Sequence, residues 1–371
     1  MRYLILILLL STFFSLSAQK EEGEWPLFRG GADLAGRSEY TLPSSPQLLW
    51  SVNTGARTKS SPVVSGGMVF FGNDKGTLFA VSTSGSVKWK YESGNAIEAA
   101  PMIAGNKVIV GSTDGILRAI DKSTGKLVWS YTTDNQISGS ANLWTSGNKS
   151  GIVVGSYDYY LHCVNPETGK LLWKVETDNY VNGTPALLNG NIVFGGCDGI
   201  VRIVDPLTGK QKDTINVGIY IAASPALSRN LICFGDYEGT IYCINTSTRK
   251  MAWSVPSAGD GGSILAIPAI SGDAVLIGSE DKYMYCYSAS TGKLNWKLRI
   301  NGRITGSAVI SSSKVLFPGM DGYVYIVSLA DGKKLWSYNT GTPVGSSPAM
   351  TSGRFYILTE DGRLLAFGEK K

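Results

Sequence analysis

The residues of this chain that could carry redox or metal chemistry are few, namely five cysteines and one histidine. No Cys-x-x-Cys pair occurs, so a zinc site has no support. Cys163, Cys243 and Cys286 stand where other copies of a repeat have alanine, and small buried core residues are expected there. Cys197 is expected in a turn and Cys233 in a core strand. Cys233 and Cys243 flank one predicted hairpin, whose register the sequence leaves open, so their bonding is undecided.

The single histidine, His162, lies beside a predicted strand and has no second histidine with which to hold a metal. A catalytic triad would need an acid and a hydroxyl in places that the sequence does not indicate. We therefore interpret His162 as a surface or packing residue. The glycine-rich run at 259–263 lacks the Lys-Ser/Thr ending of a phosphate loop and opens no helix, so a flexible loop is expected. The sequence thus predicts no catalytic, cofactor-binding or metal-binding residue, and we expect a protein that is not an enzyme.

Acidic residues recur at one position of the repeat and would form a ring on one face of the molecule. They are Asp114, Asp158, Asp198, Glu238, Asp281, Asp321 and Asp361. Such a ring could bind cations or a basic partner. Aspartate also suits tight turns, and most of these residues precede a glycine, so we interpret them as turn formers.

These residues belong to an internal repeat of about 41 residues, which decides the fold class. Apolar runs end at equivalent positions, which are Gly72, Gly111, Gly155, Gly195, Gly235, Gly278, Pro318 and Leu358. Each copy reads as four short strands joined by three turns, with an acidic turn and then a Thr-Gly turn. Four-stranded units of this length that cannot bury both faces alone stack around an axis. The sequence predicts an all-β, eight-bladed β-propeller of four-stranded antiparallel blades.

The two ends of the chain complement each other. The last copy stops after Phe367, before its fourth strand, and a strand of the missing type stands at 47–50, before the first full copy. Pairing this N-terminal strand with the last three would close the ring and remove exposed sheet edges. The predicted layout is a signal peptide at 1–18, an N-terminal entry segment at 19–46 and the propeller at 47–371.

Seven of the nine tryptophans occupy one slot of the repeat, where each should dock between adjacent blades. They are Trp50, Trp89, Trp129, Trp173, Trp253, Trp296 and Trp336. Asp213 stands in this slot in the fourth copy, so the interface beyond blade 4 is predicted to be the least stable. The sequence leaves open whether Trp144, outside the slots, faces the core or a ligand.

The first residues have the pattern of a secretory leader, with Arg2 before an apolar stretch that ends near Ala18. The alternative of a membrane anchor is disfavoured because the stretch is short for a span. Gln19 stands where a bacterial lipoprotein would have cysteine. The formal charge is +5, and no run of Lys and Arg appears, so nucleic acid is an unexpected partner. A periplasmic or secreted protein with no membrane span after leader removal is expected.

The Thr-Gly-Lys-x-x-Trp turns and the segment from Trp25 to Gly30 resemble the tryptophan-docking repeats and entry motif of pyrroloquinoline-quinone (PQQ)-like propellers. The resemblance covers nearly the whole chain after the leader. One branch of that superfamily consists of quinone-dependent dehydrogenases, with a quinone and a calcium ion on the axis and an adjacent cysteine pair that this chain lacks. The other branch, the outer-membrane assembly factor BamB and its relatives, consists of binding scaffolds of this size.

The resemblance therefore implies a scaffold without cofactor that binds envelope proteins, with the outer-membrane β-barrel assembly machinery as a candidate partner. A secreted binder of small molecules or glycans is the alternative, and a PQQ-dependent dehydrogenase is the least favoured. The variable loops that follow the tryptophan strands should carry the function. The candidate partner-binding residues are Arg57, Lys59, Gln136, Asn179, Tyr180, Tyr220 and Arg303.

Overall fold

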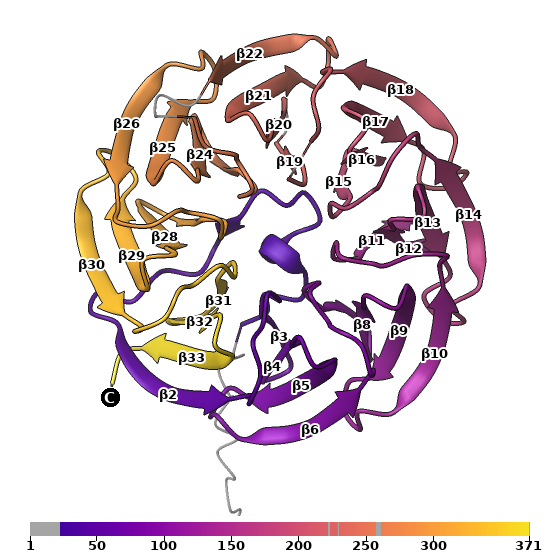
Figure 1. Cartoon of the computed structure of the whole chain (residues 1–371), viewed down its shortest axis with the longest axis horizontal. Coiled ribbons are helices and arrows are strands. Elements are labelled where there is room, and N and C mark those ends of the chain that lie inside the picture. The colour runs from indigo at the N-terminus through magenta and orange to yellow at the C-terminus, as the bar shows by residue number, and fades with distance from the viewer. Residues whose placement is uncertain (1–22, 222, 229, 257–260, 371) are drawn as a thin grey trace, which may run out of the picture.

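The computed structural model describes residues 23–221, 223–228, 230–256 and 261–370. The sheets stand radially around a single axis, like the blades of a propeller (Figure 1). Eight blades are present, each with four antiparallel strands of its own, and the only helix of the described residues is a short 3-10 turn. The predicted all-β, eight-bladed propeller is confirmed.

Within blades 1 to 7 the strands run in chain order from the axis to the rim, as the labels of Figure 1 show. Blades 1 and 2 contain β3 (Val63–Ser65), β4 (Met68–Phe71), β5 (Thr77–Ser82), β6 (Val87–Glu92), β7 (Met102–Ala104), β8 (Lys107–Gly111), β9 (Ile116–Asp121) and β10 (Leu127–Thr132). Blades 3 and 4 contain β11 (Asn142–Ser146), β12 (Lys149–Gly155), β13 (Tyr160–Val164), β14 (Leu171–Glu176), β15 (Ala186–Leu188), β16 (Asn191–Gly195), β17 (Ile200–Val204) and β18 (Gln211–Asn216).

The second half of the ring repeats this order. Blades 5 and 6 contain β19 (Ala226–Leu227), β20 (Leu231–Gly235), β21 (Thr240–Asn245), β22 (Met251–Pro256), β23 (Ala269–Ser271), β24 (Ala274–Gly278), β25 (Tyr283–Ser288) and β26 (Leu294–Arg299). Blade 7 contains β27 (Val309–Ser311), β28 (Lys314–Pro318), β29 (Tyr323–Ser328) and β30 (Lys334–Asn339). Blade 8 contains β31 (Ala349–Thr351), β32 (Arg354–Leu358), β33 (Arg363–Gly368) and β2 (Gln47–Asn53).

Burial explains why the inner strands read as continuous apolar runs. The second and third strands of a blade are covered by both neighbouring blades; Val69, Phe70 and Phe71 of β4, for example, are all fully buried. The fourth strand forms the rim, where exposed and partly covered residues alternate, as in β14 and β22. Stacking of the blades therefore produces a core that runs around the whole ring.

The ring is closed by strands from the two ends of the described chain. β2 pairs antiparallel with β33, with Trp50 opposite Ala366, and it completes blade 8 as its outermost strand (Figure 1). The closure predicted from the incomplete last copy is confirmed. The junction of the two ends is therefore held by a full strand ladder rather than by an open blade edge.

The segment before β2 crosses one end of the axis and bonds to the innermost strands of successive blades. Its carbonyl groups accept hydrogen bonds from the amides of Val64, Ile103, Leu187, Leu227, Ile270 and Ile310, in blades 1, 2, 4, 5, 6 and 7. Its strand β1 (Arg37–Ser38) then runs parallel to β27 of blade 7. The segment thus ties most of the ring together on the face that carries the first hairpin turns.

The 3-10 turn η1 (Phe28–Gly30) lies over the axis, where it places a buried arginine (Figure 1). Arg29 is 1% exposed and donates to the carbonyl oxygens of Ala308 at 2.5 Å, Pro268 at 2.8 Å and Leu34 at 3.3 Å. Burial lowers the pKa of the guanidinium to about 9, so the group is still charged at neutral pH. Arg29 therefore connects the entry segment to blades 6 and 7 through charge-assisted hydrogen bonds.

The predicted signal peptide at 1–18 lies outside the described residues. Within the described ranges, no helix has the length and apolar character needed to cross a membrane.

Candidate functional site

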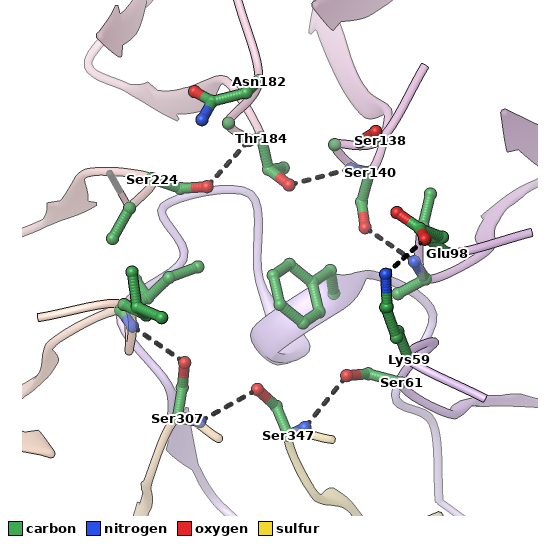
Figure 2. A pocket seen from close by; sticks show the side chains of 18 of the residues that line it. Lys59, Ser61, Glu98, Ser138, Ser140, Asn182, Thr184, Ser224, Ser307 and Ser347 are labelled. Atoms are coloured by element: carbon green, nitrogen blue, oxygen red, sulfur yellow. Dashed lines mark hydrogen bonds and ion pairs between the residues drawn. The ribbon is translucent and has the colours of Figure 1, made fainter. Parts of the chain in front are cut away.

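The axis of the propeller holds a funnel with a cavity of about 200 Å³, which opens on the face of the loops that join successive blades. Phe28 of the entry segment lies at its base. Around the wall, the hydroxyl at the start of one blade accepts a hydrogen bond from the backbone amide of the preceding blade (Figure 2). The acceptors are Ser61, Ser140, Thr184, Ser224, Ser307 and Ser347, at distances of 2.7–3.2 Å.

This hydroxyl belt is interrupted at blades 2 and 6, where Ala100 and Ile267 take the position of the serine. Six of the eight blade junctions are therefore linked by it. Because the hydroxyl oxygens accept backbone amides, their first role is to hold the blades together. The hydroxyl side chains of this wall are small and polar, and they are already engaged in hydrogen bonds between blades.

Three of the candidate cations lie at the mouth of the funnel or beside it, and each faces an acid. Lys59 Nζ lies 2.6 Å from Glu98 Oε1, and this hydrogen bond raises the pKa of Lys59 (Figure 2). The guanidinium groups of Arg57 and Arg303 approach Glu360 at 3.6 Å and Glu280 at 2.9 Å. The side chains of the three cations remain more than half exposed. The charge of each of these three candidate cations is thus balanced locally by a carboxylate.

The opposite side of the mouth is aromatic. The ring of Tyr180 lies 4.6 Å from that of Tyr157 and 5.3 Å from that of Tyr159, centroid to centroid. Tyr180 and Tyr159 are 38% and 43% exposed. We call Tyr157, Tyr159 and Tyr180 the tyrosine cluster. It presents amphipathic rings to solvent above blades 3 and 4.

The other candidates flank this cluster. The carbonyl of Gln136 accepts the amide of Tyr157, and the side chain of Asn179 donates to the carbonyl of Cys197 at 3.5 Å. Tyr220 is 57% exposed, and Tyr237 of the next blade is 48% exposed. The structure thus brings Gln136, Asn179 and Tyr180 together, while Arg57, Lys59 and Arg303 lie on the other side of the mouth.

Sequence reasoning missed Tyr157, Tyr159 and Tyr237. Tyr157 and Tyr237 precede the turn acid of their copies, a position that faces the mouth in every blade. Its occupants are Asp74, Thr113, Tyr157, Cys197, Tyr237, Glu280, Met320 and Glu360. A comparison of the copies at this variable position would have shown three acids in blades 6, 8 and 1 and two tyrosines in blades 3 and 5.

The acidic turn residues are used inside the blades, as their interpretation as turn formers implies. Asp114, Asp158, Asp198, Asp281 and Asp321 each accept the backbone amide two residues further on. Each also pairs with the side chain four residues on, which is Arg118, His162, Arg202, Tyr285 and Tyr325 respectively. In blade 5 Glu238 occupies the same turn position before Gly239, but Asp236 makes the equivalent contacts: it accepts the amides of Glu238 and Thr240 and the hydroxyl of Tyr242.

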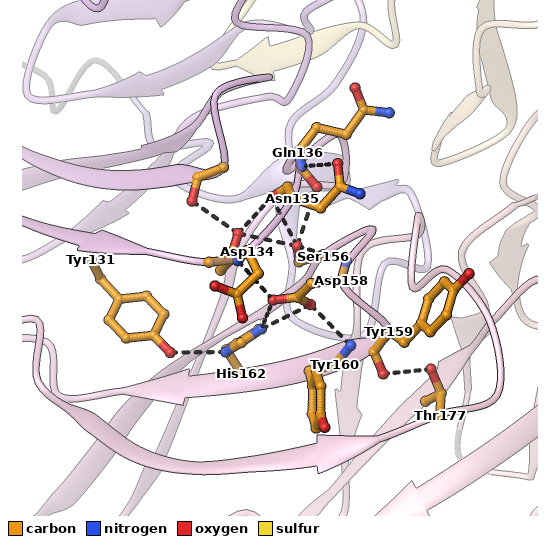
Figure 3. A network of polar contacts seen from close by, with 12 residues as sticks. Tyr131, Asp134, Asn135, Gln136, Ser156, Asp158, Tyr159, Tyr160, His162 and Thr177 are labelled. Atoms are coloured by element: carbon orange, nitrogen blue, oxygen red, sulfur yellow. Dashed lines mark hydrogen bonds and ion pairs between the residues drawn. The ribbon is translucent and has the colours of Figure 1, made fainter.

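His162 is one of these partners, and it is buried. Its Nε2 lies 3.0 Å from Asp158 Oδ2, and its Nδ1 lies 2.9 Å from the Tyr131 hydroxyl (Figure 3). The packing interpretation is confirmed, and the surface alternative is excluded by an exposure of 2%. Burial alone would raise the pKa of Asp158, but hydrogen bonds from His162 and from the amides of Asp134 and Tyr160 hold it below its usual value. The group supports the turn and carries no nucleophile.

Four of the five cysteines are buried in the blades, and Cys197, in its predicted turn, is free and partly exposed. Cys163 and Cys286 are buried and free, and burial raises the pKa of their thiols to about 12 and about 11. Cys243 is also buried, but the expectation of an ordinary core residue was incomplete, since it forms a disulfide with Cys233 directly across the β20–β21 ladder.

Trp144 belongs to the core at 4% exposure, and its Nε1 lies 3.3 Å from Cys163 Sγ.

The slot tryptophans lie between blades. In six interfaces the indole N–H donates to a carbonyl of the next blade at 2.8–3.0 Å; these tryptophans are Trp50, Trp89, Trp129, Trp173, Trp253 and Trp296. Trp336 instead packs edge-on against Phe355 and Phe367 of blade 8. Asp213 forms a 2.8 Å ion pair with Arg249 of blade 5.

Eight four-stranded blades with tryptophans docked between them define a propeller of the PQQ-like repeat class. More narrowly, the chain belongs to the family described as outer membrane protein assembly factor BamB, whose model matches residues 43–148, 137–214 and 238–370. No curated protein sequence matches the chain significantly.

Solved structures share the fold at low sequence identity. BamB from Moraxella catarrhalis superimposes with a TM-score of 0.74 and 19% identity, covering 88% of this chain and all of that one. Quinohemoprotein alcohol dehydrogenase from Comamonas testosteroni gives a TM-score of 0.80 at 15% identity, over 94% and 81% of the two chains. A europium-containing methanol dehydrogenase gives 0.82 at 13% identity, over 94% and 99%. These likenesses establish the fold and leave open the activity.

The residues on the axis do not fit the quinone and metal ion of the dehydrogenase branch. Of the described residues that line the funnel, only Lys59 and Glu98 are charged, and they bind each other. Within the same described ranges, no group of three or more His, Cys, Asp or Glu side chains is placed to hold a metal ion. The Cys233–Cys243 disulfide is buried within blade 5 and does not line the funnel.

Proposed function

We propose that this protein is a non-catalytic scaffold of the cell envelope that binds a protein partner through its loop face, in a role like that of BamB in outer-membrane protein assembly. The observation that carries the proposal is the tyrosine cluster at the mouth of the axial funnel. Exposed tyrosines on a rigid scaffold are typical anchors of protein interfaces, since they bury a large area with few rotatable bonds.

The pairing of the cations indicates which part of the loop face should contribute most to binding of the partner. Arg57, Lys59 and Arg303 are each paired with a carboxylate, so a partner would have to compete for them. Exposed ion pairs of this kind contribute little to affinity but influence the rate of encounter. The tyrosine cluster, with Tyr220 beside it, should therefore provide most of the binding energy.

Two further features support an extracytoplasmic location. The first residues read as a leader, and the Cys233–Cys243 disulfide is of a type that persists in oxidising compartments. The family match supports the assembly role, since the family is described by that role.

The test is affinity purification of the tagged full-length protein from gently solubilised envelopes, followed by mass spectrometry. We expect recovery of an outer-membrane β-barrel assembly protein, and loss of that partner from a Tyr159→Ala/Tyr180→Ala variant. Leu207→Ala, a 44% exposed residue in the turn between β17 and β18 on the opposite face, is the matched control and should retain the partner.

Charge reversal of Arg57 and Arg303 should weaken the partner less than the tyrosine substitutions do. A clean preparation without any envelope protein would overturn the scaffold proposal. It would favour a small-molecule or glycan ligand instead, which would stack on the same tyrosines above the funnel.

A further inference from the structure

The tryptophan slots share a construction that goes beyond the indole itself. In six interfaces the indole lies against the glycine of the Thr-Gly turn of the next blade, or its equivalent, where a Cβ on that glycine would come within 2.6–2.9 Å of the ring. The pairs are Trp50–Gly85, Trp89–Gly125, Trp129–Gly169, Trp173–Gly209, Trp253–Gly292 and Trp296–Gly332. Each slot is thus a space between two blades with a glycine as its wall and a backbone carbonyl as acceptor for the indole N–H.

The interface between blades 4 and 5 departs from this construction at both positions. Asp213 replaces the tryptophan, and Arg249 replaces the glycine while keeping the same positive φ, at 57°. Their ion pair joins the two blades at the rim, where the side chains are 30% and 50% exposed. No indole of the described chain lines this slot.

A cavity of about 180 Å³ remains there. Val193 and Ile203 of blade 4 and Leu227 and Ile232 of blade 5 form its apolar walls, and each of the four is at most 7% exposed. Thr246 stands at the repeat position whose carbonyl accepts the indole N–H elsewhere, and it lines the cavity. Arg249 also lines it.

The size and chemistry of this cavity match an aromatic ring. An apolar cavity of roughly 150 Å³ in a protein core is enough to bind benzene. A guanidinium beside the cavity adds a favourable contact with the face of a ring. Asn189, Asn191 and Ser247 contribute polar groups to the lining, as would suit the N–H of an indole and the backbone that carries it.

We propose that this slot between blades 4 and 5 is a binding site for an aromatic side chain, of tryptophan type, presented by a partner polypeptide. A polypeptide is the expected source because a tryptophan from a strand fills the space in the other seven slots. The slot lies between the blades and is lined by residues other than those of the tyrosine cluster, so the two sites can be tested separately.

The probe is N-acetyl-tryptophanamide, titrated into the full-length protein and followed by isothermal titration calorimetry. We expect a dissociation constant on the order of 1 mM, as suits a small single-site fragment. N-acetyl-leucinamide should bind at least about tenfold more weakly, because it lacks the ring.

Two variants should block the site. Asp213→Trp/Arg249→Gly restores the construction of the other slots and fills the cavity from within, and Ile203→Phe narrows it from the wall. Each should abolish binding of the probe, and the second keeps the test usable if the double variant does not fold. Tyr180→Ala, on the loop face, is the matched control and should bind the probe like the unmodified protein.

Absence of probe binding to the unmodified protein would overturn the proposal, as would binding that survives both blocking variants. Binding of free indole without binding of the capped amino acid would also overturn it, since the site would then serve a small molecule rather than a side chain.

Discussion

Asp213 and Arg249 form a 2.8 Å ion pair across the boundary between blades 4 and 5, at the two positions that elsewhere hold a tryptophan and a glycine in contact. The two replacements explain each other. Without the indole, the turn no longer needs glycine, and an arginine side chain can pass over the space that the indole leaves. The effect of either residue on stability can therefore be interpreted only when both are replaced together.

Replacing Asp213 alone by tryptophan should fail to stabilise the protein, because the Cβ and side chain of Arg249 stand where the indole needs a glycine. The pair Asp213→Trp/Arg249→Gly should raise the free energy of unfolding by about 1.5–3 kcal/mol, the value of burying one large apolar side chain. Thermal and urea unfolding of the two single variants and the double variant measure this as a coupling energy. Additive effects of the two substitutions would contradict the explanation.

The sequence-based prediction that this interface is the least stable in the ring stays open. Hydrogen exchange resolved by residue would decide it, since amides of β18 and β19 should then exchange before those at the seven interfaces that hold a tryptophan.

Loss of the Cys233–Cys243 disulfide should destabilise the protein moderately. The bond closes a loop of ten residues, for which chain entropy predicts about 2–3 kcal/mol. Cys233→Ser/Cys243→Ser, compared with Cys197→Ser as a control for a cysteine outside the bond, should show this in the urea midpoint. An unchanged midpoint after reduction of the unmodified protein would argue that the bond does not contribute.

Arg29 should be the most sensitive position of the entry segment. Arg29→Met removes the donor of three buried carbonyl groups, on the segment itself and on blades 6 and 7, and should reduce stability by about 3–5 kcal/mol. Arg37→Met, eight residues on, removes an exposed partner of Asp33 and should change stability by less than about 1 kcal/mol. Differential scanning calorimetry of both variants gives the comparison, and equal effects would refute it.

Acid should weaken the blades through their turn aspartates. The pKa values of Asp114, Asp158 and Asp361 are all held below the ordinary value by hydrogen bonds that oppose the effect of burial. A carboxyl group whose pKa is lowered by folding stabilises the native state above its unfolded pKa of about 4, and this contribution is lost as the pH falls through the lower native value. Stability should therefore fall steadily below about pH 4.

Asp158→Asn tests this for one residue. It should be less stable than the unmodified protein at pH 7, since Asn cannot replace the carboxylate opposite His162, and its stability should depend less on pH in the acid range. Asp178→Asn, which removes an exposed acid, controls for the loss of one charge. Parallel curves of stability against pH for all three proteins would contradict the prediction.

Much of the architecture could be predicted from the sequence because it depends on local sequence patterns that repeat. Asp-Gly turns, apolar runs and the Thr-Gly-x-x-x-Trp ending recur around the ring with small changes, so errors in one copy are corrected by the others. The missing fourth strand after Phe367 and the extra strand around Trp50 were enough to predict ring closure. The turn role of the aspartates followed from the same repetition, except in blade 5, where Asp236 stands two residues earlier than the series, and in blade 8, where Thr359 rather than Asp361 accepts the amide of Arg363.

The sequence by itself determined the number of blades and their strand order, because these depend on periodicity along the chain. Only the tertiary structure decided which side chains contact each other across the strand ladders and between the blades. The disulfide depends on a ladder register that places Cys233 opposite Cys243, and the tyrosine cluster depends on two neighbouring blades bringing Tyr157 and Tyr180 within contact. The pairing of Asp213 with Arg249, and the cavity beneath it, arise because docking between blades joins residues that are 36 positions apart, and no local signal connects them.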